Sequence, residues 1–437
     1  MKKLLYLILC VMLATSILAG CQGGTNDSSS ASSGYDRNEG LDPNAASAFF
    51  DDFTDANFSA SIWDVMNQKW GPDFNHGVRP ENVLWNNSGI VTLKSYGQYY
   101  KDASKTCQGG VLITKDSYGP GRYEVKMKLL PRFGACTAFW TYMYGNSQDL
   151  EGNSHKDLNQ EIDIELNVGN SFKQAWFTNW VTVDDSAHVE KELPSPLNDG
   201  EWHVYTFEWH TDPMRVDYYI DGIHYYTSYS YVPYVAGAIN IGNWFPDGWA
   251  GTPDFEEDYV QLDYVSFTPY KGQPCIPSNA GGGGASFPTV STPLPAVANL
   301  ISDGSFENVY QSGKGPWAYY KTCETVSENG AKAMKVSAGG TVSQIISGAY
   351  DGFEYTLKAS VKGVSGASIK IYYLKDSTEY IGAPTVYNLD SLTNEYGEIE
   401  FSFTAPEGCR RVEVALCGGN DHAIFDNVFM NLSKLMK

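Results

Sequence analysis

The ten residues from 159 to 168, NQEIDIELNV, contain three carboxylates at alternate positions. Side chains of a β-strand alternate between its two faces, so Glu161, Asp163 and Glu165 share one face and aliphatic residues occupy the other. The aliphatic face fits a hydrophobic core. Three acids on the opposite face repel one another, which costs folding free energy. This stretch therefore predicts a strand whose acidic face needs an explanation.

The rest of the chain consists of similar short runs separated by Gly, Asn and Asp. Runs such as GRYEVKMKLL and WHVYTFEWH alternate with period two, and YIDGIHYY is typical of a hairpin that turns at Asp221-Gly222. The later runs EYTLKASVKG and GEIEFSFTA alternate in the same way. No long helical period is present. The pattern predicts an all-β protein made of two sandwiches.

Two low-complexity stretches divide the chain. Residues 21–45 are small and polar and predict a flexible tether, and residues 271–298 contain GGGG followed by FPTVSTPLPAVA, which predicts a Gly/Pro-rich linker. These breaks leave globular segments at 46–270 and 299–437.

The N-terminus has the composition of an export signal. Two lysines precede an apolar run, and Leu18-Ala19-Gly20-Cys21 resembles a bacterial lipobox. The resemblance implies a signal peptide at 1–20, cleavage before Cys21 and acylation of its thiol, which would anchor the protein to a bacterial membrane at the cell surface. The alternative is an ordinary secretory signal with a coincidental cysteine. Both interpretations place the mature protein outside the cytosol.

Net charge and cysteine content indicate which classes of ligand and metal site the chain is expected to have. The chain has 30 lysine and arginine residues against 51 aspartate and glutamate residues, a net charge of −21, which argues against a nucleic-acid partner. A neutral ligand is the simpler expectation. Export permits disulfides among the cysteines that follow the signal, but their pairing is not readable from the sequence. The absence of a CxxC pair argues against a zinc site.

The acidic face of 159–168 has three interpretations. Retaining glycosidases need two carboxyl groups about 5–5.5 Å apart, one as nucleophile and one as acid/base. Two Glu residues four apart on a curved sheet could lean toward each other, with Asp163 raising the pKa of a neighbour and orienting the nucleophile. The alternatives are a solvated acidic sheet face and a site for a hard cation.

Further segments favour the first interpretation. E-I-D-I-E resembles the catalytic strand of glycoside hydrolase family 16, and several other segments resemble signatures of that family. They are FFDDF at 49–53, YGPGRYEVKMKLLP at 118–131, GACTAFWTYMYG at 134–145, WHVYTFEWHTDPMRVDYYIDG at 202–222 and DYVQLDYVSFTP at 258–269. The resemblance covers nearly all of 46–270.

The resemblance implies a concave β-jelly roll with a glycan cleft, and retaining endo-hydrolysis of a β-linked polysaccharide without a catalytic cofactor. It makes Glu161 the nucleophile, Asp163 its assisting residue and Glu165 the acid/base. The motif has no extra residue between Asp163 and Glu165, which is typical of the lichenase-like and xyloglucan-transglycosylase branches and favours a β-1,3-1,4-glucanase. The alternatives are a β-1,3-glucanase, a β-galactan hydrolase or a transglycosylase of the same fold, and a non-catalytic glycan-binding lipoprotein.

The resemblance also implies substrate contacts, for which aromatic side chains supply stacking faces. For each aromatic residue the alternative is core packing. An arginine common in lichenases is replaced near Ile113, and the segment GNSQDLEGNSHKDLNQ lengthens the connection before the acidic strand. The implied contacts are Asn75, Trp140, Tyr142, Asn179, Trp180, Asn243, Phe245 and Trp249.

The second segment, 299–437, resembles jelly-roll carbohydrate-binding modules at its start and finish, with a structural spacer as the alternative. Trp317 is either a sugar-stacking platform or core. Structural calcium is expected from the resemblance at Gly89 with Asp263 in the first segment, and at Glu307 with Asp426 in the second. The alternative for Asp263 is a strand cap without metal. We expect a monomer that binds polysaccharide.

Overall fold

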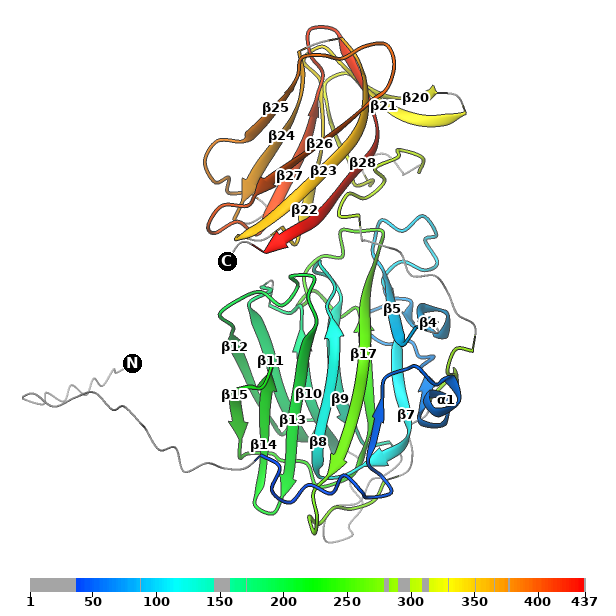
Figure 1. Cartoon of the computed structure of the whole chain (residues 1–437), viewed down its shortest axis with the longest axis vertical. Helices are drawn as coiled ribbons and strands as arrows, with labels where there is room; N and C mark the ends of the chain where they lie inside the picture. Colours follow the sequence, from blue (N-terminus) through cyan, green and yellow to red (C-terminus); the bar gives the residue numbers. More distant parts are fainter. Residues whose placement is uncertain are drawn as a thin grey trace, which may run out of the picture. The chain divides into compact units, whose positions relative to one another are not determined.

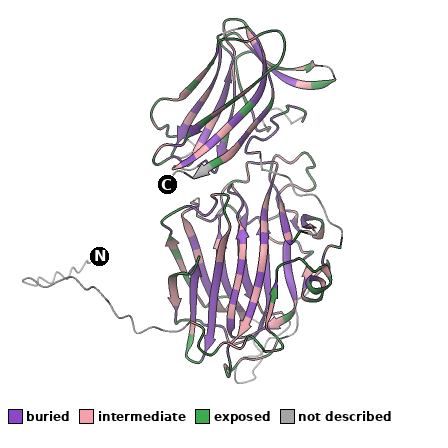
Figure 2. Ribbon diagram, in the orientation of Figure 1, coloured by how far each residue is buried: buried purple, intermediate pink, exposed green. Residues whose placement is uncertain are grey.

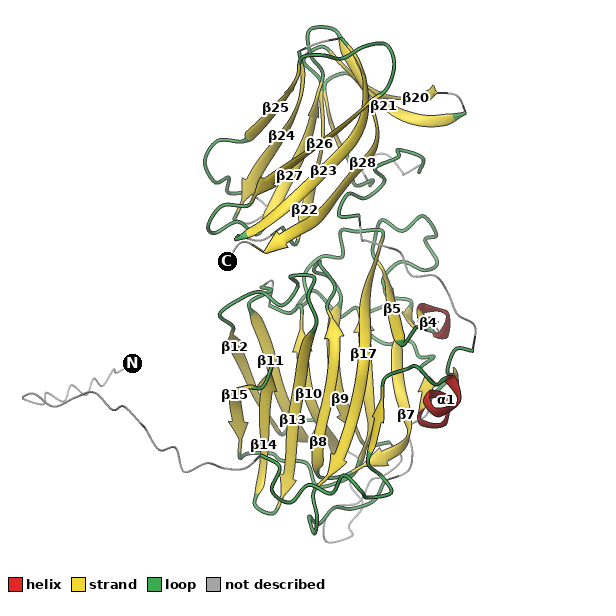
Figure 3. Cartoon of the chain, in the orientation of Figure 1, coloured by secondary structure: helices red, strands yellow, loops and turns green. Residues whose placement is uncertain are grey.

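The computed structural model describes residues 37–86, 88–144, 158–169, 171–278, 283–289, 299–308, 314–328, 330–349, 351–364, 366–375 and 378–435. The predicted signal peptide and Cys21 lie outside these residues. Strands dominate both globular segments (Figures 1 and 3), so the all-β prediction is confirmed. Among the described residues, no helix is long and apolar enough to cross a bilayer.

The first segment contains two antiparallel sheets. One has ten strands in the order β15-β14-β13-β8-β17-β5-β6-β3, with β1 pairing with β17 and β4 with β5. Its strands are β1 (Phe49–Asp51), β3 (Gly77–Val78), β4 (Val83–Asn86), β5 (Ile90–Tyr96), β6 (Gln108–Gly109), β8 (Gly121–Lys128), β13 (His203–Thr211), β14 (Met214–Ile220), β15 (Ile223–Ser228) and β17 (Glu257–Pro269). Among the described strands of this sheet, β3 and β6 are the one pair that runs parallel.

The other sheet, here called the cleft sheet, has eight strands in the order β12-β11-β10-β9-β16-β7-β2-β18. They are β2 (Trp63–Val65), β7 (Val111–Tyr118), β9 (Cys136–Tyr142), β10 (Leu158–Leu166), β11 (Gln174–Thr182), β12 (Ser186–Glu192), β16 (Gly237–Trp244) and β18 (Ala285–Ser286). A short helix α1 (Ala56–Ile62) is capped by Asp55, whose side chain accepts from two backbone N–H groups, and a 3-10 turn η1 spans Pro80–Asn82.

The core lies between these two sheets and explains the alternation of β10. Ile162, Ile164 and Leu166 are fully buried there, and they join a cluster that includes Phe207 of the ten-stranded sheet. Phe139 of β9 packs on Phe207 with ring centroids 5.1 Å apart. Figure 2 shows the alternation of buried and partly exposed residues along these strands. The aliphatic half of β10 therefore fixes which way its acids point.

The flexible segments predicted around this sandwich are more ordered than expected. In the predicted tether, Leu41 forms a β-bridge with Tyr270. In the predicted linker, β18 pairs with β2 and Ile276 forms a bridge with Val235. Backbone pairing with a sheet edge therefore fixes parts of both stretches, which composition alone does not reveal.

The second segment contains two five-stranded sheets with a core between them. Trp317 is 5% exposed, packs on Phe306 and donates its Nε1 proton to the carbonyl of Asp303, so it belongs to the core. In order across the first sheet, the strands are β19 (Ala318–Tyr320), β22 (Thr341–Ser347), β27 (Arg411–Cys417), β24 (Ala367–Leu374) and β25 (Thr385–Leu389). In order across the second sheet, they are β20 (Cys323–Glu328), β21 (Ala331–Ser337), β28 (His422–Leu435), β23 (Phe353–Gly363) and β26 (Gly397–Thr404).

Candidate active site

The three acids lie side by side with aromatic residues of the neighbouring strands. Glu161 is opposite Tyr142 of β9 and Trp180 of β11. The same pairing places Asp163 opposite Trp140 and Glu165 opposite Trp176. Pairing runs without a register shift from Glu161 to Leu166 on both sides. The strand therefore has no bulge between Asp163 and Glu165, as the motif predicts.

A cleft of about 650 Å³ opens over these acids. It contains Trp140 and Tyr142, as predicted, and three further aromatic side chains. Its walls are formed by Gln68, Trp70, Gly71, Ala138, Trp140, Tyr142, Tyr144, Glu161, Asp163, Glu165 and Trp244. Acids set in an aromatic cleft suit a ligand with apolar ring faces and polar edges, as sugars have.

Hydrogen bonds orient two of the acids. Asn159 donates from Nδ2 to Oε2 of Glu161 at 3.1 Å. Trp180 donates from Nε1 to Oδ2 of Asp163 at 3.2 Å. Trp180 was predicted to contact substrate; the structure places it beside the acids with its ring nitrogen directed to Asp163.

The environment holds all three acids toward their protonated forms. Burial and, as the smaller cause, the charge of Glu161 together raise the pKa of Glu165 to about 8. Burial raises the pKa of Glu161 to about 7, opposed by hydrogen bonds from Asn159 and Asp163. Burial and then the charges of both glutamates raise the pKa of Asp163. One acid can thus stay protonated as a proton donor near neutral pH while another is ionised.

These shifts predict the pH dependence of hydrolysis. With the roles that the resemblance implies, Glu161 would gain a proton below about pH 7 and could not attack, and Glu165 would lose the proton it must donate above about pH 8. We expect kcat/KM to peak near neutral pH, with limbs that belong to the coupled set of acids. Rates measured over the pH range in which circular dichroism is constant would check this. An acid limb near the usual glutamate pKa would contradict it.

Six of the eight predicted substrate contacts are not among the residues that line the cleft, and four of these six are almost fully buried. Asn179 is fully buried and donates from Nδ2 to the carbonyls of Ser230 and Tyr231. Asn243 is fully buried, donates to the carbonyl of Leu93 and accepts from Thr137. Both lie on the core-facing side of their strands. The other two are Asn75 and Phe245.

Asn75 and Phe245 contact each other behind the cleft wall. Phe245 is 1% exposed and belongs to the core, and its carbonyl accepts from Nδ2 of Asn75 at 2.5 Å. The amide oxygen of Asn75 accepts from the backbone N–H of Gly77. A Cβ at Gly71, where φ is +82°, would lie 2.4 Å from this amide. Asn75 therefore supports the turn that carries Trp70 and makes no cleft contact itself.

The aromatic residues around the cleft form a continuous series, part of which the sequence prediction missed. Trp70 packs on Trp140 and Trp244, with centroids 6.0 and 6.5 Å apart. Trp249, which was predicted, lies 5.6 Å from Trp244 and stacks on Trp176 at 5.3 Å. Strand parity could have identified Trp244, because it shares the face of Asn240, whose Oδ1 accepts from Tyr144.

The calcium sites expected from the resemblance differ in how well they fit. Oδ2 of Asp263 is 2.6 Å from Nζ of Lys126, and this ion pair competes with a cation beside Gly89. In the second sandwich, burial and then the charges of Glu307 and Glu398 raise the pKa of Asp426. Carboxylates that repel one another in this way fit a cation better than Asp263, which is already paired with Lys126.

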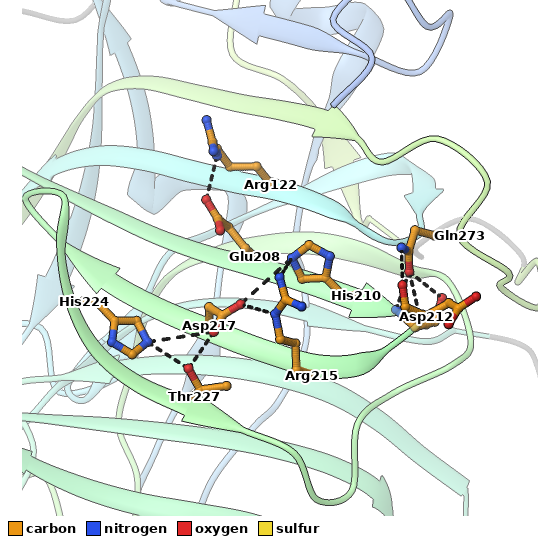
Figure 4. A network of polar contacts seen from close by, with 10 residues as sticks. Arg122, Glu208, His210, Asp212, Arg215, Asp217, His224, Thr227 and Gln273 are labelled. Atoms are coloured by element: carbon orange, nitrogen blue, oxygen red, sulfur yellow. Dashed lines mark hydrogen bonds and ion pairs between the residues drawn. The ribbon is translucent and has the colours of Figure 1, made fainter. Parts of the chain in front are cut away.

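A further cluster of possible metal ligands lies on the ten-stranded sheet (Figure 4). Ligand atoms of Glu208, His210 and Asp217 lie within 4.8 Å of one another. Nε of Arg122 is 2.9 Å from Glu208, and Nε of Arg215 is 2.7 Å from Asp217. Each carboxylate therefore has an arginine partner, and the group is a buried ion-pair network with little charge left to attract a metal.

We expect Arg122→Met to destabilise this sandwich by about 3–5 kcal/mol, because the fully buried Glu208 would lose its charged partner. The free energy of unfolding in urea would measure the loss. As a control, Lys69→Met removes an exposed pair with Asp73 and should cost about 0.5 kcal/mol or less. Equal losses in the two variants would contradict the prediction.

Comparison with known proteins agrees with this architecture. Residues 74–265 match the family model described as "Glycosyl hydrolases family 16", and residues 298–423 match that described as "Carbohydrate binding domain". A β-glucanase of Acetivibrio thermocellus is 30% identical over 222 residues, which cover 49% of this chain and 61% of that protein. The chain thus spans about three fifths of the length of that relative.

Two further proteins are similar to about the same share of this chain. The endo-1,3-1,4-β-glycanase ExoK of Rhizobium meliloti is 26% identical and covers 51% of this chain and 78% of its own. The structure of a Bacillus licheniformis β-glucanase is 21% identical, covers 50% of this chain and 97% of its own, and has a TM-score of 0.42. The chain therefore contains a segment, 74–265, that matches family 16 glycosyl hydrolases, followed by a segment, 298–423, that matches a carbohydrate-binding domain.

Proposed function

We propose that this protein is a retaining endo-β-glucanase that acts on β-1,3-1,4-glucan. The observation that carries the proposal is the set of three acids on one strand, which is paired without a register shift from Glu161 to Leu166, at an aromatic cleft where burial raises their pKa values. In such a site one glutamate can attack as a carboxylate while the other still holds a proton.

The proposed reaction has two steps. The carboxylate of Glu161 attacks the anomeric carbon, while Glu165 gives its proton to the glycosidic oxygen and the leaving sugar departs. Glu165, now ionised, takes a proton from water, and the resulting hydroxide displaces Glu161 from the anomeric carbon. Two inversions give net retention. Trp180 donates to Asp163, and Asp163 in turn forms a hydrogen bond with Glu161 that lowers the pKa of Glu161.

The glucan linkage is supported by two features. The unbulged motif is one, and the names of two relatives, β-glucanase and endo-1,3-1,4-β-glycanase, are the other. The test is hydrolysis of mixed-linkage β-glucan, laminarin, a β-galactan and xyloglucan, with product anomers followed by NMR. We expect fastest release from mixed-linkage glucan with the β-anomer formed first. Faster release from laminarin or galactan would refute the linkage, and α-anomers would refute retention.

We also propose that the second sandwich binds the polysaccharide and that acylated Cys21 anchors the protein outside the cytosol. Tethered binding would raise the local concentration of substrate at the active site. Radiolabelled palmitate incorporation into the wild type, compared with Cys21→Ser, would test the anchor. Label retained by the variant would contradict it.

A further inference from the structure

Asn159 hydrogen-bonds to Glu161 and has no role in the mechanism above. It lies two positions before Glu161 on β10, next to a register shift in the pairing with β11, and its hydrogen bond places its side chain beside that of Glu161. Its Nδ2 donates to Oε2 of Glu161 at 3.1 Å, and Asn159 itself is half-buried. A hydrogen bond to an ionised carboxylate is stronger than one between neutral groups.

Asn159 differs from the acids and phenols around Glu161 because its side-chain amide does not titrate. Asp163 and Glu165 share its strand, and the phenols of Tyr142 and Tyr144 interact with its charge from the β9 side. Trp180, opposite on β11, carries no titratable group. Asp163 can donate to Glu161 only while it is protonated, whereas the amide of Asn159 donates at every pH. Asn159 is thus the donor to Glu161 that titration cannot remove.

We propose that Asn159 is a positioning residue that holds the Glu161 carboxylate in its attacking orientation and stabilises its ionised form. This rests on the proposed function, in which Glu161 is the nucleophile. The carboxylate is ionised before attack and again when the sugar leaves it, so the amide supports both steps. The side chain makes its contact with Glu161 and need not touch the sugar.

The first measurement does not require turnover. Protein labelled with ¹³C at glutamate carboxyls is titrated by NMR, with Glu161→Gln to assign the Glu161 signal. In Asn159→Ala the pKa of Glu161 should rise, because a donor to the ionised form is lost. Asn159→Asp should raise it further by adding a charge beside Glu161. An unchanged pKa in both variants would overturn the proposal, whether or not the wild type hydrolyses glucan.

The second measurement is kinetic. On the best glucan, Asn159→Ala should lower kcat about ten- to a hundredfold with little change in KM, and move the acid limb of the pH profile upward. Gln174→Ala is the matched control, because it removes an amide that donates to exposed Glu190 at the edge of the same sheet. If the role of Asn159 were purely structural, Asn159→Ala would change KM and stability together and leave the acid limb of the pH profile unchanged. That result would refute the positioning role.

The two hypotheses fail in different ways. A wild type that hydrolyses none of the glucans refutes the proposed function, while the NMR titration still decides whether Asn159 controls Glu161. If the wild type is active and the pKa of Glu161 is the same in Asn159→Ala, the positioning role is refuted and the proposed function stands. Should Asn159→Ala not fold, Asn159→Ser keeps a polar side chain too short to repeat the amide contact and takes its place in both measurements.

Discussion

Glu161→Gln should lower kcat on β-glucan by about 10⁴-fold or more, because an amide cannot form the covalent bond to the anomeric carbon. The substitution keeps the size of the side chain beside Tyr142 and Trp180. Polysaccharide binding and the far-ultraviolet circular dichroism spectrum should therefore match the wild type. Initial rates on mixed-linkage glucan with the purified variant measure the effect.

The same substitution should act on the partner acid. The charge of Glu161 raises the pKa of Glu165, so its removal should lower that pKa. Glu190→Gln, which changes an exposed acid on β12 of the same sheet, is the control and should leave both activity and the Glu165 pKa unchanged. Glucan hydrolysis by Glu161→Gln within tenfold of the wild-type rate would contradict the assigned role.

Glu165→Ala should show a loss that depends on the leaving group. On polysaccharide, whose leaving alcohol needs a proton, we expect kcat/KM to fall about 10²–10⁴-fold. On a dinitrophenyl β-glycoside, whose leaving group departs without a proton, the first step should be nearly normal and breakdown of the covalent intermediate should become limiting. Burst kinetics on that substrate measure both steps.

Added azide distinguishes this mechanism from its alternatives. Azide needs no general base, so it should accelerate turnover of Glu165→Ala and yield the β-glycosyl azide, with the configuration retained. An α-glycosyl azide would indicate a single inverting displacement. Absence of any acceleration would mean that Glu165 is not the acid/base.

The sequence predicts the fold and the centre of the site well because both follow from alternation. In β10 the buried Ile162 and Ile164 require the acids to face away from the core, and no tertiary information is needed to see it. The same reasoning, applied to β16, separates Trp244 on the cleft face from Asn243 on the core face. The prediction took Asn243 and Phe245 from family resemblance and missed this parity.

Other features depend on contacts that sequence patterns do not encode. Trp70 enters the cleft because the turn at Gly71 is held by Asn75, which belongs to a loop with no regular period. The stack of Trp176 on Trp249 joins a strand to a loop more than 70 residues later. The pairing of Ala285 with Val65 likewise joins two segments far apart in sequence, one of them in a stretch whose composition indicates a linker.

One strand carries the reactive acids, whereas the rings around them come from separate segments. Glu161 and Glu165 are fixed to the same backbone as the aliphatic residues that anchor β10 in the core, so their spacing can change only if the core is rebuilt. Trp70, Trp244 and Trp249 lie outside that strand, Trp244 on β16 and the other two between strands. The residues that would surround a bound ligand can therefore vary separately from the strand that holds the acids.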